Sequence, residues 1–117
     1  MRTSDIILRI SLDEQQMCNK IHWQAEEQGE TSWNEASIMM LSLYDTLQQN
    51  TAGIDLWTTG VPIDEMESHC FNTLMKLAGT LERATQDQEG ATIIKDAALR
   101  YRELTNQRKN ENKQQID

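Results

Sequence analysis

The chain has 117 residues, a formal net charge of −8 at pH 7 and 38% hydrophobic residues. Its length fits one domain with a single modest core, and no apolar run approaches the roughly 20 residues that span a bilayer. The acidic charge argues against general binding to nucleic acid or to anionic membranes, because both attract positive surfaces. No secretory signal pattern is seen at its start, so we expect a cytoplasmic protein.

The first predicted elements are two strands. Apolar and polar side chains alternate over residues 5–12, which is typical of a strand with one buried face. Ile7 is the exception, an apolar residue on the other face. Residues 21–26 alternate in the same way after a polar connection. The pattern predicts an antiparallel hairpin, after which the chain turns at residues 28–30.

Residues 36–48 allow two interpretations. Ser32 and Glu35 have the spacing of a helix capping box, and the apolar residues that follow recur at helical spacing. These residues are Ala36, Met39, Met40, Leu43, Tyr44 and Leu47. We therefore predict a helix over residues 36–48. In the competing interpretation residues 38–44 form a strand paired with residues 53–58, because this segment begins with a nearly continuous apolar run.

A short strand is predicted over residues 54–58, before Pro62, which cannot continue a strand ladder. A helix follows over residues 64–85, where apolar residues from Met66 to Ala84 recur at helical spacing. Asp64 and Glu67 resemble a second capping arrangement, and acidic residues suit the positive end of a helix dipole.

The last predicted helix starts near Ala91 and buries a second apolar stripe. Beyond Thr105 the chain has almost nothing to bury, so residues 107–117 are expected to form a disordered polar tail. Residues 1–106 are then expected to form one domain.

These elements predict an α+β fold in the order β-β-α-β-α-α. The most economical packing is a small, mostly antiparallel three-stranded sheet with the helices on one face. If Ile54 and Leu56 face the helices, then Ile7, Asp55 and Trp57 share the bare face of the sheet. An exposed apolar patch often marks a contact surface, so these three residues form a candidate contact face for a partner or for a second copy.

The chain carries few signals of chemistry. Cys18, His22, His69 and Cys70 do not have the spacing of zinc ligands, and two cysteines are too few for a disulfide framework. Adjacent helix residues such as His69 and Cys70 cannot form a nucleophile and base pair. Asp55 lies in a strand, where aspartate is disfavoured, but no partner for catalysis is indicated nearby. We therefore assign no catalytic, cofactor-binding or metal-binding residues.

The order and spacing of several motifs resemble the gliding motility-associated GldC family of Bacteroidetes. The run GIDLWTTGVPIDEM carries the resemblance most clearly, and the similarity covers about residues 3–86. The matching pieces are Ile54–Thr58, Pro62–Met66, Phe71–Leu74 and Glu82–Thr85. Thr59, Cys70 and Tyr44 depart from the family pattern. The resemblance implies a small cytoplasmic protein without known catalytic activity, associated with a gliding machinery that includes membrane and envelope proteins.

Three functions follow from these observations. The leading hypothesis is a non-catalytic interaction protein of a gliding apparatus, with protein partners and no cofactor. The second is a small enzyme or ligand-binding domain with a site near the turn from Asp55 to Pro62. The third is an adaptor or chaperone that binds a peptide along an open sheet edge.

Overall fold

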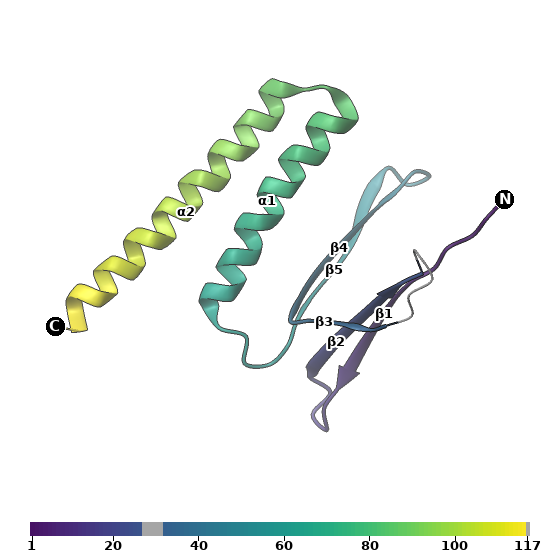
Figure 1. Cartoon of the computed structure of the whole chain (residues 1–117), viewed down its shortest axis with the longest axis horizontal. Coiled ribbons are helices and arrows are strands. Elements are labelled where there is room, and N and C mark those ends of the chain that lie inside the picture. The colour runs from purple at the N-terminus through teal and green to yellow at the C-terminus, as the bar shows by residue number, and fades with distance from the viewer. Residues whose placement is uncertain (27–31, 117) are drawn as a thin grey trace. The chain divides into compact units, whose positions relative to one another are not determined.

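The computed structural model describes residues 1–26 and 32–116, the last three of these by their backbone alone. The chain divides into two compact units, residues 1–61 and residues 62–117. The first unit holds the strands and the second holds the helices (Figure 1). No helix in the described ranges is long and apolar enough to span a membrane. The predicted α+β class is confirmed.

A three-stranded antiparallel sheet forms the start of the first unit. It contains β1 (Ile6–Leu12), β2 (Cys18–Ala25) and β3 (Asn34–Ala36), in the order β1-β2-β3. The predicted hairpin of the first two strands is confirmed. Ile21 of β2 pairs with Ile10 on one side and with Ala36 on the other, and it is only 1% exposed. The turn predicted at residues 28–30 lies outside the described residues.

The predicted helix over residues 36–48 is wrong. This segment forms β4 (Ile38–Asp45), which pairs antiparallel with β5 (Asn50–Trp57) in a separate two-stranded sheet. Glu35, expected to cap the helix, lies in β3. The competing strand interpretation is correct, because a nearly continuous apolar run satisfies the helical and the strand period together, and pairing with a neighbouring strand then decides between them.

Two tight turns of similar chemistry close the two hairpins. In the turn after β1, the carboxylate of Asp13 accepts hydrogen bonds from the backbone N–H groups of Gln15 (2.9 Å) and Met17 (3.0 Å). In the turn after β4, the carboxylate of Asp45 accepts hydrogen bonds from the N–H groups of Leu47 (2.9 Å) and Gln48 (3.0 Å). An aspartate that bonds the backbone ahead of it favours a turn over a continuing helix.

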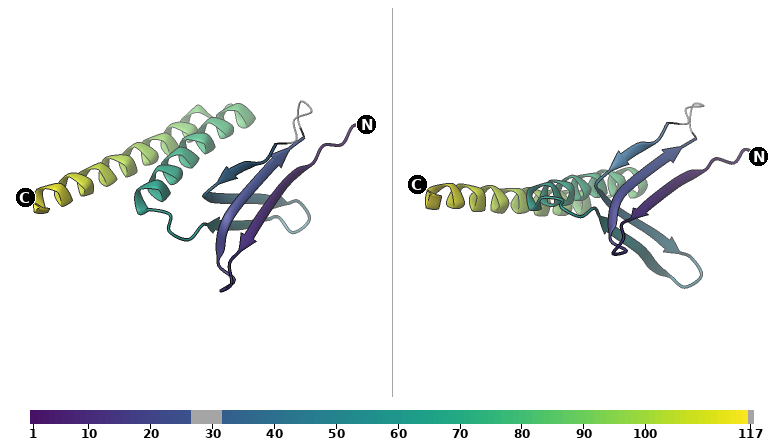
Figure 2. Two further views of the ribbon diagram at one scale, coloured as in Figure 1. Left: turned by 60° about the horizontal axis from the view of Figure 1, so that its bottom comes forward. Right: turned by 90° about the horizontal axis from the view of Figure 1, so that it is seen from below.

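One residue, Ser37, separates β3 from β4, so a single stretch of chain serves both sheets (Figure 2). The N–H of Thr58 donates to the Ser37 carbonyl (2.9 Å), and the N–H of Thr59 donates to the Cys18 carbonyl (3.0 Å). The first bond connects the end of β5 to the junction of β3 and β4, and the second connects it to the start of β2. The five strands therefore belong to one unit, although they form two sheets in place of the single three-stranded sheet expected.

The second unit is a pair of helices, α1 (Ile63–Thr85) and α2 (Gln88–Ile116), that run side by side in Figure 1. Pro62 precedes α1, and α1 has no side-chain capping bond, so the predicted capping role of Asp64 is wrong. Asp64 and Glu65 do lie in the first turn, where they complement the helix dipole. The carboxylate of Asp87 accepts from the N–H of Gly90 (2.8 Å) at the start of α2.

Small residues are buried where the two helices pack. Ala78 of α1 and Ala91 and Ala98 of α2 are almost completely buried. A single ion pair joins the helices among the described residues, between Lys95 and Glu82 (3.8 Å). Alanine side chains therefore form the most buried part of the helix pair.

The C-terminal segment differs from the expected tail. The helix α2 continues through residues 107–116, and the side chains of residues 107–113 are exposed. The segment contains no glycine or proline and is rich in glutamine, lysine, arginine and glutamate, which favour a helix even without a buried face. The expected single domain over residues 1–106, with its helices on one face of a sheet, involves both units and stays a prediction.

Candidate functional site

The three residues of the predicted contact face lie on two different sheets. Ile7, 40% exposed, lies on β1 of the three-stranded sheet. Asp55 and Trp57 lie on β5, and both are exposed. Asp55 and Trp57 are two residues apart on one strand and therefore share a face of the β4–β5 hairpin. A contact role for all three residues stays a prediction, but Ile7 and Trp57 do not belong to one sheet.

The register of the β4–β5 hairpin defines two faces, because directly paired residues point to the same side. What we call the Trp57 face consists of the four pairs Ile38 with Trp57, Met40 with Asp55, Ser42 with Gly53 and Tyr44 with Thr51. What we call the Leu43 face consists of the four pairs Met39 with Leu56, Leu41 with Ile54, Leu43 with Ala52 and Asp45 with Asn50. Both faces carry several large apolar side chains. A strand with one buried face would alternate between apolar and polar residues.

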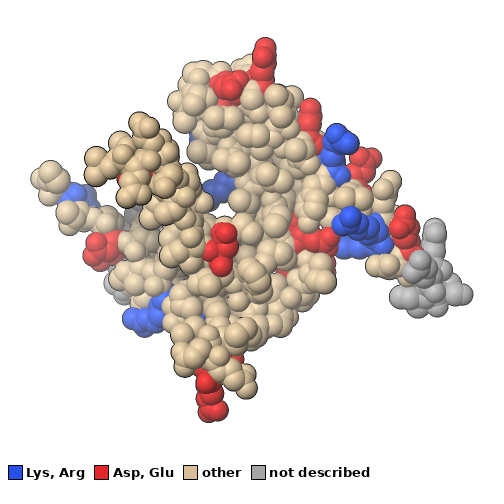
Figure 3. Space-filling model, turned by 180° about the vertical axis from the view of Figure 1, so that it is seen from behind, with Lys and Arg blue, Asp and Glu red and all other residues tan. Residues whose placement is uncertain are grey.

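Large side chains are exposed on both faces. Trp57 is 56% exposed and Tyr44 is 64% exposed on the Trp57 face, and Leu43 is 63% exposed on the Leu43 face. Figure 3 shows wide areas of one side of the molecule without acidic or basic side chains. Exposed apolar patches rimmed by polar residues mark interaction surfaces in soluble proteins. The β4–β5 hairpin is therefore the first candidate functional site.

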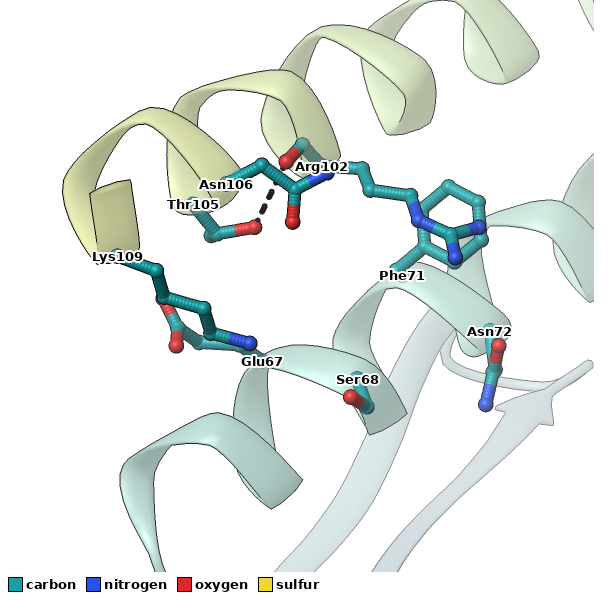
Figure 4. A pocket seen from close by; sticks show the side chains of 8 residues that line it. All are labelled: Glu67, Ser68, Phe71, Asn72, Arg102, Thr105, Asn106 and Lys109. Carbon is teal, nitrogen blue, oxygen red and sulfur yellow. Dashed lines mark hydrogen bonds between the residues drawn. The ribbon is translucent and has the colours of Figure 1, made fainter. Parts of the chain in front are cut away.

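A polar groove between the two helices is a second candidate (Figure 4). Its volume is about 240 Å³. The lining side chains come from both helices: Glu67, Ser68, Phe71 and Asn72 from α1, and Arg102, Thr105, Asn106 and Lys109 from α2. Serine, asparagine and lysine residues at these positions gave no sequence signal, because they become a group only when the two helices are placed side by side.

The contacts that the structure shows in this groove join its lining residues to one another. The guanidinium of Arg102 lies over the ring of Phe71, 4.7 Å from its centroid, in a cation–π arrangement. The hydroxyl of Thr105 donates to the Arg102 carbonyl (2.9 Å). Ser68 is exposed and no histidine lines the groove. The lining can form hydrogen bonds and ion pairs with a polar segment, but it holds no nucleophile with a base beside it.

Tyr101 is half-buried on α2 in the same helical unit. Burial raises the pKa of its phenol above 10.0, negative charge at Glu67 and at the Cys70 sulfur adds to the rise, and Arg108 opposes it. The folded chain therefore keeps the phenolic proton to a higher pH than the unfolded chain. The protonated phenol therefore adds to the free energy of unfolding. This gain is fully present below about pH 10, and it is lost as the pH rises through the pKa of the folded state.

Replacing Tyr101 with phenylalanine is expected to remove this alkaline loss of stability. The free energy of unfolding of the wild type should fall relative to that of Tyr101→Phe between about pH 9 and about pH 11, because only the wild type carries the phenol. Urea unfolding followed by circular dichroism at both pH values measures the difference. Two curves that remain parallel across this range would contradict the raised pKa.

The four possible metal ligands considered from the sequence lie on two elements. Cys18 is buried and His22 is half-buried on β2, whereas His69 and Cys70 are half-buried neighbours on α1. Within residues 1–26 and 32–116, no three His, Cys, Asp or Glu side chains are grouped so that they could hold a metal ion.

Comparison with known protein families gives a match. Residues 18–107 match the family model described as "Gliding motility-associated protein GldC-like". No curated protein and no solved structure matches the chain. The match covers most of the chain and includes the β4–β5 hairpin and both helices up to residue 107.

Proposed function

The chain belongs to the GldC-like family of gliding motility-associated proteins, and from this membership we propose that it is a non-catalytic accessory protein of a gliding apparatus that acts through protein contacts. We place its action in the cytoplasm, where two free cysteines such as Cys18 and Cys70 are the normal state. The proposal assigns the partner contact to the Trp57 face of the β4–β5 hairpin.

The exposure of Trp57 is the observation that carries the proposal. Tryptophan, tyrosine and methionine are enriched at the centres of protein interfaces, where they bury much area and lose little side-chain entropy. The Trp57 face combines one of each with Ile38, and Asp55 adds an acidic group at its middle. This composition suits a partner with an apolar patch and a basic side chain that can pair with Asp55.

The polar groove supports the same conclusion in a different way. Its charged and amide side chains are suited to hydrogen bonding with another protein, and its arginine is already stacked on Phe71. Asp55 is exposed on its strand and not in an enclosed pocket with a second acid or a histidine beside it. An enzymatic role near the turn from Asp55 to Pro62 therefore has no supporting observation.

Recovery of partners from the native cell tests the proposal. The tagged Trp57→Asp variant is expected to recover its partner at least about tenfold less than the wild type, because truncation of a central interface tryptophan typically costs 2 kcal/mol or more. The matched control is Trp33→Asp, since Trp33 is an exposed tryptophan of the same unit but outside the hairpin. Equal recovery by Trp57→Asp and wild type would overturn the assignment of this face.

The same variants can be tested for motility. Cells in which Trp57→Asp is the sole copy are expected to spread less on a surface, whereas cells with Trp33→Asp should spread normally. Normal spreading with both variants, at equal protein levels, would argue against a role of the Trp57 face in gliding.

A second function is favoured by a specific observation on β1. Within the described residues β1 is an edge strand, paired only with β2, and Ile6 and Leu12 beside the edge are exposed. An open edge with apolar neighbours can accept an extended peptide as an added strand. Loss of binding of the recovered partner on Arg9→Pro, with binding intact in Trp57→Asp, would favour this adaptor function.

A further inference from the structure

One side of α2 carries a row of positive charge. Lys95, Arg102 and Lys109 recur at intervals of seven residues and therefore lie on one face of the helix. Acidic residues of the same helix lie about 100° or more around it from Arg102; these are Glu89, Asp96, Glu103 and Glu111. A positive row of this kind is unexpected in a chain whose formal net charge is −8.

Arg102 differs from the other cations of the row in what α1 places beside it. Lys95 is paired with the carboxylate of Glu82 (3.8 Å). At Arg102 the helix α1 presents an aromatic ring, and the guanidinium lies 4.7 Å from the centroid of Phe71. Within the residues that the structure describes, Arg102 forms no ion pair. Its positive charge is therefore left for a carboxylate from outside the helix pair.

The surroundings of Arg102 suit such a carboxylate. A guanidinium held over a ring keeps edge N–H groups available, and these match the two oxygens of a carboxylate. Beside it, the polar groove is lined by Ser68, Asn72 and Asn106, all of which are exposed (Figure 4). None of these three side chains forms a hydrogen bond with another described residue. The groove therefore offers several unused donors around one fixed cation.

We propose that this groove binds an extended segment of another protein through one aspartate or glutamate side chain, which pairs with Arg102. The amides of Asn72 and Asn106 bind the backbone of the segment, because an amide side chain both donates and accepts hydrogen bonds. The volume of about 240 Å³ equals that of roughly eight water molecules, which suits a side chain. The inference rests on the proposed function only in that the chain acts through protein contacts, and it assigns a second contact apart from the Trp57 face.

The charges of the groove favour a carboxylate over a phosphate. Two cations line it, Arg102 and Lys109, together with one acidic residue, Glu67. A single carboxylate balances the remaining positive charge. A phosphate ester carries nearly two negative charges at pH 7 and would leave an excess beside Glu67. The net charge of −8 also repels nucleic acids and other strongly charged polyanions.

A titration of the full chain followed by nuclear magnetic resonance tests the proposal. The probe is a short alanine peptide with one central glutamate and blocked ends, and the comparison peptide has glutamine in its place. The side-chain N–H signals of Arg102, Asn72 and Asn106 are expected to shift and to saturate, with a midpoint at about 1 mM or below. The glutamine peptide should bind at least about tenfold more weakly, because hydrogen bonds to charged groups are stronger than those between neutral groups.

Arg102→Gln and Arg100→Gln form a matched pair of variants. Both remove one positive charge from α2, but Arg100 lies about 200° around the helix from Arg102 and does not line the groove. Arg102→Gln should weaken binding of the glutamate peptide at least about tenfold, whereas Arg100→Gln should leave it within about twofold. Arg102→Lys covers the case in which Arg102→Gln does not fold. It keeps the charge but lacks the forked donors, so it should weaken binding by a smaller factor.

Three results would overturn the proposal. Without saturating shifts in the wild type, the groove does not accept a carboxylate peptide, whether it is closed or filled by the chain's own side chains. Equal losses in Arg102→Gln and Arg100→Gln would reduce the binding to general charge attraction. A peptide with phosphoserine in place of glutamate that binds about tenfold more tightly would make the ligand a phosphate. The contact of Trp57 is tested separately by recovery from cells, so either idea can fail alone.

Discussion

Replacing Ile21 with alanine is expected to destabilise the strand unit by about 2–5 kcal/mol, the cost of removing a fully buried aliphatic side chain and leaving a cavity. Ile21 is 1% exposed and is paired on both sides, with Ile10 and Ala36. Urea unfolding followed by tryptophan fluorescence measures the loss, because Trp23, Trp33 and Trp57 are the three tryptophans of the chain and all lie in this unit.

Ile6→Ala is the matched control for this change. It removes the same atoms from β1, but Ile6 is exposed, and its replacement should cost well under 1 kcal/mol. If Ile21→Ala and Ile6→Ala unfold at the same urea concentration, Ile21 is not the centre of this core.

Replacing Ala98 with leucine is the second change with a large expected effect. Ala98 is completely buried in the helical unit, together with Ala78 and Ala91. A leucine there must push the helices apart or take a strained rotamer, which typically costs about 1–3 kcal/mol. Thermal unfolding followed by the helical circular dichroism signal should therefore show a lower midpoint.

Ala97→Leu provides the comparison at the neighbouring position. Ala97 is exposed on the same helix, and leucine is almost as good a helix former as alanine, so this variant should unfold close to the wild type. If Ala98→Leu is as stable as Ala97→Leu, the helices do not approach each other through their alanines.

The same two probes address the domain organisation. Tryptophan fluorescence reports on the strand unit, and helical circular dichroism reports mainly on α1 and α2. If residues 1–106 form one domain, the two signals change together, because a single domain of this size usually unfolds in one transition. Two separate transitions would show that the units unfold independently.

The sequence was sufficient to predict those elements in which the spacing of apolar residues fits only a strand or only a helix. The alternation over residues 5–12 predicted β1, and the apolar stripe from Met66 to Ala84 predicted α1. It was not sufficient for β4, because Met39, Met40 and Leu43 fit the helical and the strand pattern equally well. What separates the two patterns is the partner strand, β5, and the turn held by Asp45.

The candidate sites were predicted less well, for a related reason. Asp55 and Trp57 were placed correctly on one face because they are two residues apart on a single strand. The prediction that Ile7 shares this face assumed that all strands form one sheet. The structure has two sheets, and Ile7 lies on the other one. The groove residues Ser68 and Asn106 come from different helices. A local pattern cannot show which distant side chains meet, since that depends on how whole elements pack.

The order of the pairings has a consequence for how the chain folds during its synthesis. β1 pairs with β2, β4 with β5 and α1 with α2, so each close partner follows its neighbour directly along the chain. Contacts between neighbours close short loops, which favours fast folding. Both hairpins can therefore form as they emerge, before α1 has been synthesised. During that interval a newly made chain already exposes large apolar side chains of β4–β5 such as Leu43, Tyr44 and Trp57, which favours aggregation.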